Sequence, residues 1–119
     1  MNRRRFVAIA ASTLATLAGR PAQAHAVVMH SAPAANATIS GPDIDILIRF
    51  NSRIDTARSR LRLTDLSGRY RSVDIGDRRE PNAMIARIVD LAGGSYRLSW
   101  QVLAVDGHIT RGEIPFTVA

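Results

Sequence analysis

With 119 residues, 16 basic side chains, 10 acidic side chains and no cysteine, the chain has room for one small domain. Without cysteine it cannot form disulfides, thiolate metal sites or thiol nucleophiles. A folded domain of this size therefore depends on burial of an apolar core alone, and a metal site would have to use histidine, carboxylate or methionine side chains.

Residues 1–24 have the composition of a secretory signal peptide. A basic segment, Met1–Arg5, precedes a small-residue apolar segment, Phe6–Gly19, and Ala22-Gln-Ala24 is an A-x-A cleavage site. The apolar run is too short for a transmembrane helix. The leading arginines also resemble a twin-arginine leader, so both Sec and twin-arginine export stay open. We expect cleavage after Ala24 and a mature domain of residues 25–119.

Removal of the leader changes the charge of the protein. Four arginines leave with it, and the mature chain keeps 12 arginines against 10 acidic residues, a formal charge of +2. These arginines fall mostly on outward-facing strand positions, where solvated charge is expected. We therefore expect no nucleic-acid partner, no membrane-spanning segment after cleavage, and a monomer.

The remaining residues alternate between apolar and polar side chains with the period of two that is typical of strands. Polar or glycine-containing turns separate these segments, and no helical period is present. The predicted strands are Val27–Met29, Ile44–Phe50, Arg60–Thr64, Tyr70–Ile75, Met84–Val89, Ser95–Val102 and Ile114–Val118. Seven short strands at this spacing predict an all-β fold, an immunoglobulin-like antiparallel β-sandwich with Greek-key connections.

Some side chains can be assigned to positions within such a sandwich. The segment Leu91–Tyr96 resembles a tyrosine corner, in which the phenol bonds to upstream backbone. Trp100 lies on the apolar face of its strand and is predicted to be in the core. Met29 and Met84 are also predicted to fill the core.

The sequence Asp106-Gly-His108 places two metal-binding side chains two residues apart, between the last two strands. A turn between strands lies at the rim of a sandwich, where side chains meet solvent. Asp-Gly is also a common turn former, so this tripeptide alone fits an ordinary hairpin turn as well.

A second histidine strengthens the case for a metal site at that turn. Cleavage after Ala24 would leave His25 at the N-terminus, where its α-amine and its imidazole Nδ1 can close a chelate ring on one ion. Together with Asp106 and His108 this gives three nitrogens and one oxygen, a donor set that suits Cu(II). A signal peptidase is, however, indifferent to the residue after the cut, so His25 alone is weak support. His30 is interpreted as solvent-facing, and the direction of Glu113 stays open between site and solvent.

Several short motifs together resemble the CopC family of periplasmic copper-binding proteins, including its YobA-like members. They span the whole mature chain and comprise the A-x-A cut before His25, His30-Ser-Ala-Pro-Ala-Ala-Asn-Ala37, Ile48-Arg-Phe-Asn-Ser52, Leu91-Ala-Gly-Gly-Ser-Tyr-Arg-Leu-Ser-Trp100, Val105-Asp-Gly-His-Ile-Thr-Arg-Gly112 and Phe116-Thr-Val118.

This resemblance implies a periplasmic, immunoglobulin-like domain whose Cu(II) ligands fall on His25, Asp106 and His108. It also implies copper buffering or carriage, with delivery to a CopD-type inner-membrane partner as a possible role and no enzymatic activity. Some members hold Cu(I) in a methionine-rich loop, but residues 72–87 contain only Met84, so no Cu(I) site is expected. Two alternatives stay open: a copper oxidase or monooxygenase with a histidine brace, and a metal-free interaction module.

Overall fold

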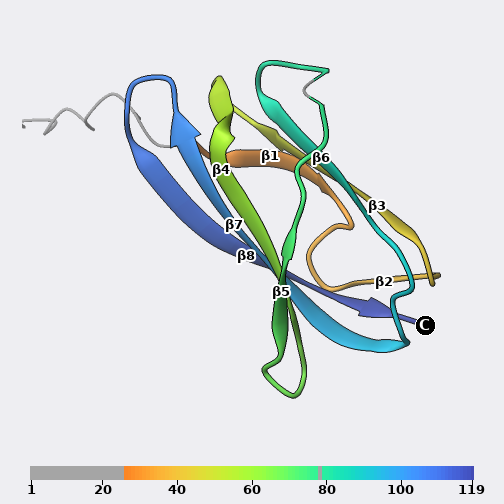
Figure 1. The fold of residues 1–119 in the computed structure, drawn as a ribbon. Coiled ribbons are helices and arrows are strands. Elements are labelled where there is room, and N and C mark those ends of the chain that lie inside the picture. Colours follow the sequence, from red (N-terminus) through yellow and green to blue (C-terminus); the bar gives the residue numbers. More distant parts are fainter. Residues whose placement is uncertain (1–25, 78) are drawn as a thin grey trace, which may run out of the picture.

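The computed structural model describes residues 26–77 and 79–119, which form an all-β domain (Figure 1). The proposed leader and His25 lie outside the described residues. The described part contains eight strands and no helix, and hence no helix that could cross a membrane. The strands are β1 (Val28–Ala32), β2 (Ala37–Ile39), β3 (Ile44–Phe50), β4 (Ile54–Asp65), β5 (Tyr70–Val73), β6 (Ala83–Ile88), β7 (Gly94–Ala104) and β8 (Ile109–Val118).

The strands form two sheets that pack face to face. The smaller sheet has the order β1-β3-β6, and the larger has the order β2-β8-β7-β4-β5. The chain changes sheet between β3 and β4. Almost all pairs are antiparallel, so the predicted immunoglobulin-like sandwich is confirmed.

The extra strand is β2, and it is parallel to its neighbour β8. Three residues, Ala37–Ile39, are too few to show an alternation in sequence. The segment is held by the ladder to residues 116–118 and by Asn36, whose N–H donates to the carbonyl of Pro115 at 2.6 Å. Position 36 has a φ of 64°, which asparagine tolerates better than most residues.

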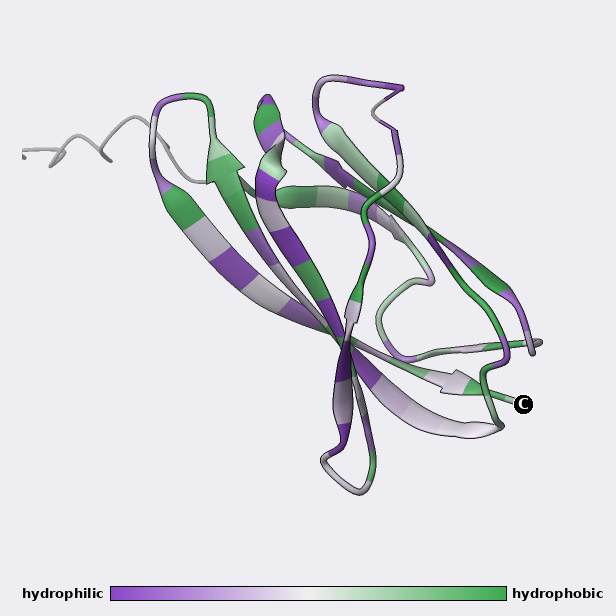
Figure 2. Cartoon of the chain, in the orientation of Figure 1, coloured by the Kyte–Doolittle hydropathy of each residue, from purple (hydrophilic) through white to green (hydrophobic). Residues whose placement is uncertain are grey.

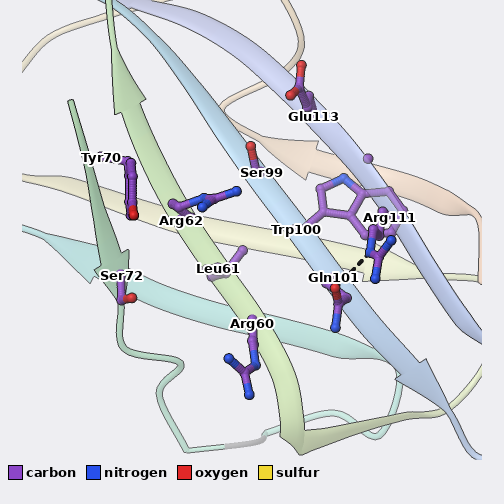
Figure 3. A pocket seen from close by; sticks show the side chains of 11 residues that line it. Arg60, Leu61, Arg62, Tyr70, Ser72, Ser99, Trp100, Gln101, Arg111 and Glu113 are labelled. Carbon is purple, nitrogen blue, oxygen red and sulfur yellow. Dashed lines mark hydrogen bonds between the residues drawn. The ribbon is translucent and has the colours of Figure 1, made fainter. Parts of the chain in front are cut away.

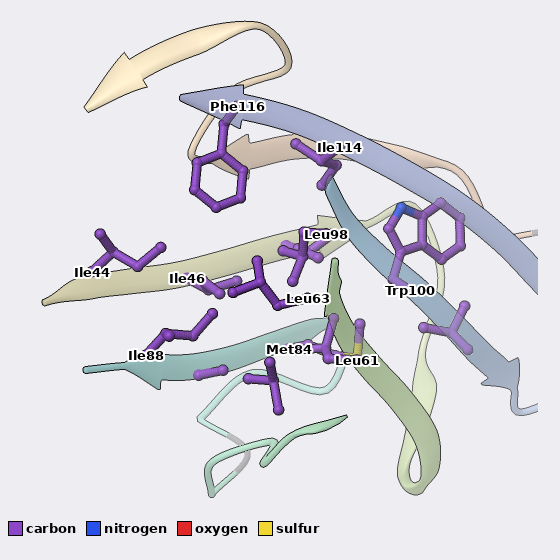
Figure 4. Packing of buried hydrophobic residues seen from close by; sticks show 14 of the residues in the cluster. Ile44, Ile46, Leu61, Leu63, Met84, Ile88, Leu98, Trp100, Ile114 and Phe116 are labelled. Atoms are coloured by element: carbon purple, nitrogen blue, oxygen red, sulfur yellow. The ribbon is translucent and has the colours of Figure 1, made fainter. Parts of the chain in front are cut away.

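Hydrophobic and hydrophilic residues alternate along the long strands (Figure 2), and buried positions alternate with more exposed ones. The inward positions of β3, β4, β6, β7 and β8 meet between the two sheets (Figure 4). Phe50 and Trp100 touch edge to face, with ring centroids 5.2 Å apart and planes at 71°. Trp100 is 8% exposed, which confirms its predicted place in the core. The largest fully buried side chains are Phe50, Ile48, Ile54, Met84, Leu98 and Val102.

The tyrosine corner is confirmed. The hydroxyl of Tyr96 donates to the carbonyl of Ala92 at 2.6 Å, and its ring stacks on Phe116 at a centroid distance of 5.8 Å. This contact fixes the entry of the chain into β7, whose other end carries the Asp106–His108 turn.

Strand β8 begins at Ile109, five residues earlier than the predicted segment, because Thr110–Gly112 continue the ladder with β7 instead of bending away. Gly112 lies opposite Trp100 in this ladder. A Cβ at position 112 would overlap the indole ring, so glycine is required there for Trp100 to lie flat against β8.

Candidate metal centre

The β7–β8 hairpin turn holds two of the three predicted ligands. The N–H of Gly107 donates to the carbonyl of Ala104 at 2.9 Å, and the N–H of Ala104 donates to the carbonyl of His108 at 2.9 Å. Gly107 has a φ of 89°, a left-handed conformation that favours glycine. The Asp-Gly pair therefore closes the turn and places Asp106 and His108 on either side of that glycine.

Within the turn, the carboxylate of Asp106 contacts His108 twice. Its Oδ1 accepts the backbone N–H of His108 at 3.1 Å and lies 3.2 Å from the imidazole Nδ1. The backbone hydrogen bond from His108 is the main cause that lowers the pKa of Asp106; burial opposes it, and the imidazole of His108 adds a lesser lowering effect. Asp106 is therefore an anion at neutral pH, beside an imidazole, with both side chains about half exposed.

The same end of the domain receives the first described residues of the chain. Asn51, at the corner between β3 and β4, accepts the N–H of Val27 through its Oδ1 at 2.8 Å and donates its own N–H to the carbonyl of Val27 at 3.0 Å. Two residues further on, the carbonyl of Arg53 accepts the N–H of Val105 at 3.3 Å. One short corner thus joins the start of β1 to the hairpin that carries Asp106.

The third predicted ligand, His25, lies outside the described residues. Its neighbour Ala26 is buried, at 2% exposure, and belongs to the core. Within residues 26–77 and 79–119, no group of three or more histidine, aspartate or glutamate side chains converges as a metal site would require. The structure thus brings Asp106 and His108 together and leaves the position of His25 as a prediction.

The other two candidates lie elsewhere. His30 is exposed on β1 and pairs with Arg49 of β3, as the solvent-facing interpretation predicts. Glu113 lies on the outer face of the larger sheet, where it is 3.8 Å from Arg97. Five residues of strand separate Glu113 from His108, roughly 16 Å, so it belongs to the sheet face and not to the turn.

Met29 and Met84 differ in burial. Met84 is fully buried, as predicted, but the prediction for Met29 is wrong, since it is 67% exposed. The register of β1 against β3 shifts between Val28 and His30, which leaves Met29 as an extra residue in a bulge. An edge strand with a bulge does not keep the alternation from which the burial of Met29 was inferred.

The sequence reasoning treated the outward arginines only as solvated charge and missed a groove of about 640 Å³ on the outer face of the larger sheet. Arg60, Arg62 and Arg111 line it. The register of three strands brings them together, and a sequence without known strand pairs does not give that register. The available signal was strand alternation. Arg60 and Arg62 flank the buried Leu61 on β4. Arg111 is an odd number of residues from the buried Ile114 on β8, which places it on the opposite, outward face.

Comparisons with known proteins agree with this fold. The family model described as the CopC domain matches residues 28–119. The protein YobA of Escherichia coli is 32% identical over 98 residues, covering 80% of this chain and 79% of YobA. Copper resistance protein C of Xanthomonas campestris is 30% identical over 112 residues, covering 87% of each chain.

Solved structures of CopC proteins have a similar fold. The crystal structure of CopC from Methylosinus trichosporium aligns with a TM-score of 0.72 and 27% identity, covering 79% of this chain and 93% of that one. PcoC, a methionine-rich copper resistance protein from Escherichia coli, aligns with a TM-score of 0.69 and 25% identity, covering 80% and 99%. The family match and the relatives, together with the shared sandwich, show that the chain belongs to the CopC family.

Proposed function

We propose that the chain is a copper-binding protein that holds one Cu(II) ion through His25, Asp106 and His108. The observation that carries this proposal is the 3.2 Å contact between Asp106 Oδ1 and His108 Nδ1 at an exposed hairpin turn. Membership of the CopC family supports it, since its relatives include a copper resistance protein.

The spacing of the two donor atoms suits a shared ion. Adjacent ligands that each lie about 2 Å from a first-row metal, at right angles, are about 2.8 Å apart. The observed 3.2 Å is close to this value, so the two side chains need only small movements once the imidazole proton has left Nδ1. The turn supplies the rest of the preorganisation, because the backbone bond from His108 to Asp106 fixes the carboxylate beside the imidazole.

His25 would complete the set after cleavage. Its α-amine becomes a ligand only then, because in the precursor the same nitrogen is an amide without a basic lone pair. Two residues of chain separate His25 from Val27, and two residues reach at most about 7 Å. Val27 itself is hydrogen-bonded to the corner that also binds the hairpin, which supports convergence of the three ligands.

Copper is the metal that best fits these donors. Three nitrogens and one carboxylate oxygen suit tetragonal Cu(II), which also exceeds zinc in the usual order of affinity for such sites. Tight Cu(I) binding is not expected, because soft thioether ligands are scarce: Met84 is buried and Met29 stands alone in its bulge.

We further propose a binding role rather than catalysis. An oxygen-activating copper site keeps a coordination position open, and Asp106 would fill it here. The leader-like residues 1–24 support a periplasmic location, and the exposed site would allow transfer of copper to a CopD-type inner-membrane partner.

A titration of the chain that begins at His25 tests the proposal. We expect one Cu(II) per chain and no displacement of copper by an equal concentration of zinc. Zero stoichiometry would identify a metal-free interaction module, and displacement by zinc would refute the donor set. Oxygen consumption by the copper-loaded protein with a reductant would contradict the binding role; we expect none above that of free copper.

A further inference from the structure

The groove on the outer face of the larger sheet is formed by β5, β4, β7 and β8 (Figure 3). Its volume is about 640 Å³. We call it the arginine groove, after Arg60, Arg62 and Arg111.

The ladder arranges these residues in two rows across the strands. In one row, Arg60 of β4, Gln101 of β7 and Arg111 of β8 are direct neighbours. In the next row, Ser72, Arg62, Ser99 and Glu113 follow one another from β5 to β8. All seven side chains stand on the solvent side of the sheet, because their strand neighbours face the core.

Two of the three guanidinium groups are held in place. Arg111 Nε donates to the side-chain oxygen of Gln101 at 2.8 Å, which leaves the remaining N–H groups of Arg111 directed away from that bond. Arg62 lies over the ring of Tyr70, 4.7 Å from its centroid. A ligand would therefore meet guanidinium groups that have already lost part of their rotamer freedom.

The charge of the groove is not balanced. Elsewhere, Arg49, Arg58 and Arg87 each form ion pairs with carboxylates, and Arg97 pairs with Glu113 at the groove wall. Arg60, Arg62 and Arg111 form no ion pair within the part of the chain that the structure describes. Glu113 is the single acidic residue that lines the groove. The groove thus keeps a net positive charge and attracts anions.

The spacing of the charges favours an extended acidic segment over a single small anion. Strands β4 and β8 are separated by β7, so Arg60 and Arg111 start about 10 Å apart, and Arg60 and Arg62 start about 7 Å apart along one strand. The contacts with Gln101 and Tyr70 oppose convergence of Arg111 and Arg62 on one point. In an extended peptide, side chains on alternate residues are about 7 Å apart on the same face, which matches the spacing of Arg60 and Arg62. Arginine also binds carboxylates in a two-pronged geometry.

We propose that the arginine groove docks an extended segment of a partner protein that carries acidic side chains on alternate residues. The proposal is independent of copper, because none of the groove residues is a proposed ligand. Since Arg111 follows His108 by three residues on the same chain, a partner docked there would lie beside the turn.

A labelled peptide of alternating aspartate and serine, eight residues long, tests this surface. We expect it to bind the copper-free protein, to weaken as salt is raised, and to shift the amide NMR signals of Ser99, Gln101 and Arg111. A peptide with asparagine in place of aspartate should bind at least tenfold more weakly. No binding of the acidic peptide at millimolar concentration, or shifts confined to other strands, would overturn the proposal.

Variants of equal net charge distinguish binding of the peptide at the groove from attraction by the overall charge of the protein. Replacing Arg60, Arg62 and Arg111 by glutamine should weaken the peptide at least tenfold. The same replacement of Arg53, Arg69 and Arg79, which lie outside the groove, should change affinity by less than threefold. Equal losses in the two variants would show that net charge alone attracts the peptide. Competition by citrate at the affinity of the peptide would identify a small-anion site and overturn the choice of a protein segment.

Discussion

Two hairpin turns at opposite ends of the larger sheet begin in the same way. In the β4–β5 turn, Asp65 Oδ1 accepts the N–H of Ser67 at 2.9 Å; in the β7–β8 turn, Asp106 Oδ1 accepts the N–H of His108 at 3.1 Å. The register of β4 with β7 places Asp65 opposite Tyr96, at the far end of β7 from the Asp106 turn. Each turn also contains a glycine with a left-handed φ, 87° in one and 89° in the other.

The turns differ in the side chain two residues after the aspartate. In the first turn it is a serine, whose hydroxyl donates to Asp65 at 2.6 Å and is the main cause that lowers the pKa of that carboxyl. In the second it is an imidazole, and the backbone N–H of His108 is the main cause that lowers the pKa of Asp106. The pKa of the turn carboxyl is therefore lowered in both turns, although the main hydrogen-bond donor differs. The imidazole is what gives only the second turn a nitrogen donor for a metal.

The largest expected effect follows from removal of that imidazole. We expect His108→Ala to weaken Cu(II) at least about 100-fold, or roughly 2.7 kcal/mol, because one of three nitrogens is lost. Ser67→Ala changes the same position of the other turn and should leave the affinity unchanged. Competitive titration against a chelator measures both. Wild-type affinity in the His108 variant would remove the hairpin from the site.

The carboxylate of Asp106 should contribute less to the Cu(II) affinity than the imidazole of His108. Asp106→Asn keeps an oxygen that can accept the turn hydrogen bond but removes the negative charge, and we expect roughly tenfold weaker Cu(II) binding, about 1.4 kcal/mol. Asp65→Asn is the matched change at the other end of the sheet and should not affect copper. A loss of affinity of the same size in both variants would show that the effect comes from overall charge.

Replacement of Gly68 or of Gly107 by alanine should lower the free energy of unfolding by the same amount. Nothing lies within 4 Å of a Cβ at Gly68 or Gly107, so the cost is that of the left-handed backbone, about 1 kcal/mol in each. Chemical denaturation measures the free energy of unfolding of the two variants. If Gly107→Ala cost nothing while Gly68→Ala did, the turn beside Asp106 would not have the conformation described.

The smallest expected effect is the pH dependence of the Asp65 turn. Because the pKa of Asp65 is lowered in the fold from an ordinary value of 3.8, its charged form stabilises the fold above that pH, and this contribution is lost as pH falls through the lower folded value. Asp65→Asn lacks this contribution. The difference in unfolding free energy between wild type and variant should therefore be present at neutral pH and shrink in acid. A difference that grows in acid would contradict a stabilising role for the charged form of Asp65.

The sequence predicts most of this fold because most strands bury one face and leave the other in water. Seven alternating segments, Ile44–Phe50 among them, predict the sandwich, and the segment Leu91–Tyr96 predicts its tyrosine corner. Strand β2 was missed because it is too short to alternate, and Met29 was misplaced because a bulge reverses the face of an edge strand. These failures lie at sheet edges, where partner strands decide the structure.

The candidate site is predictable in part for the same reason. Asp106 and His108 are neighbours in sequence, so one turn brings them together. The direction of Glu113 could have been inferred from the buried positions of Ile114, Phe116 and Val118, which leave it outward. The arginine groove could not have been inferred from the sequence, because Arg60 and Arg111 become neighbours of Gln101 only through strand pairing.

We propose that cleavage before His25 creates the ligand that completes the copper site. The most direct test of this claim compares the chain that begins at His25 with a form that carries one additional alanine, by Cu(II) titration and electron paramagnetic resonance at pH 8 and pH 6. The extended form should bind at least about tenfold more weakly and give a different spectrum. Because an amine with a reference pKa near 8 must lose its proton to bind copper, it alone should weaken the mature form about fiftyfold between these pH values. The extended form should lack this part of the pH dependence. Equal affinities, equal spectra and equal pH dependence in the two forms would contradict the claim.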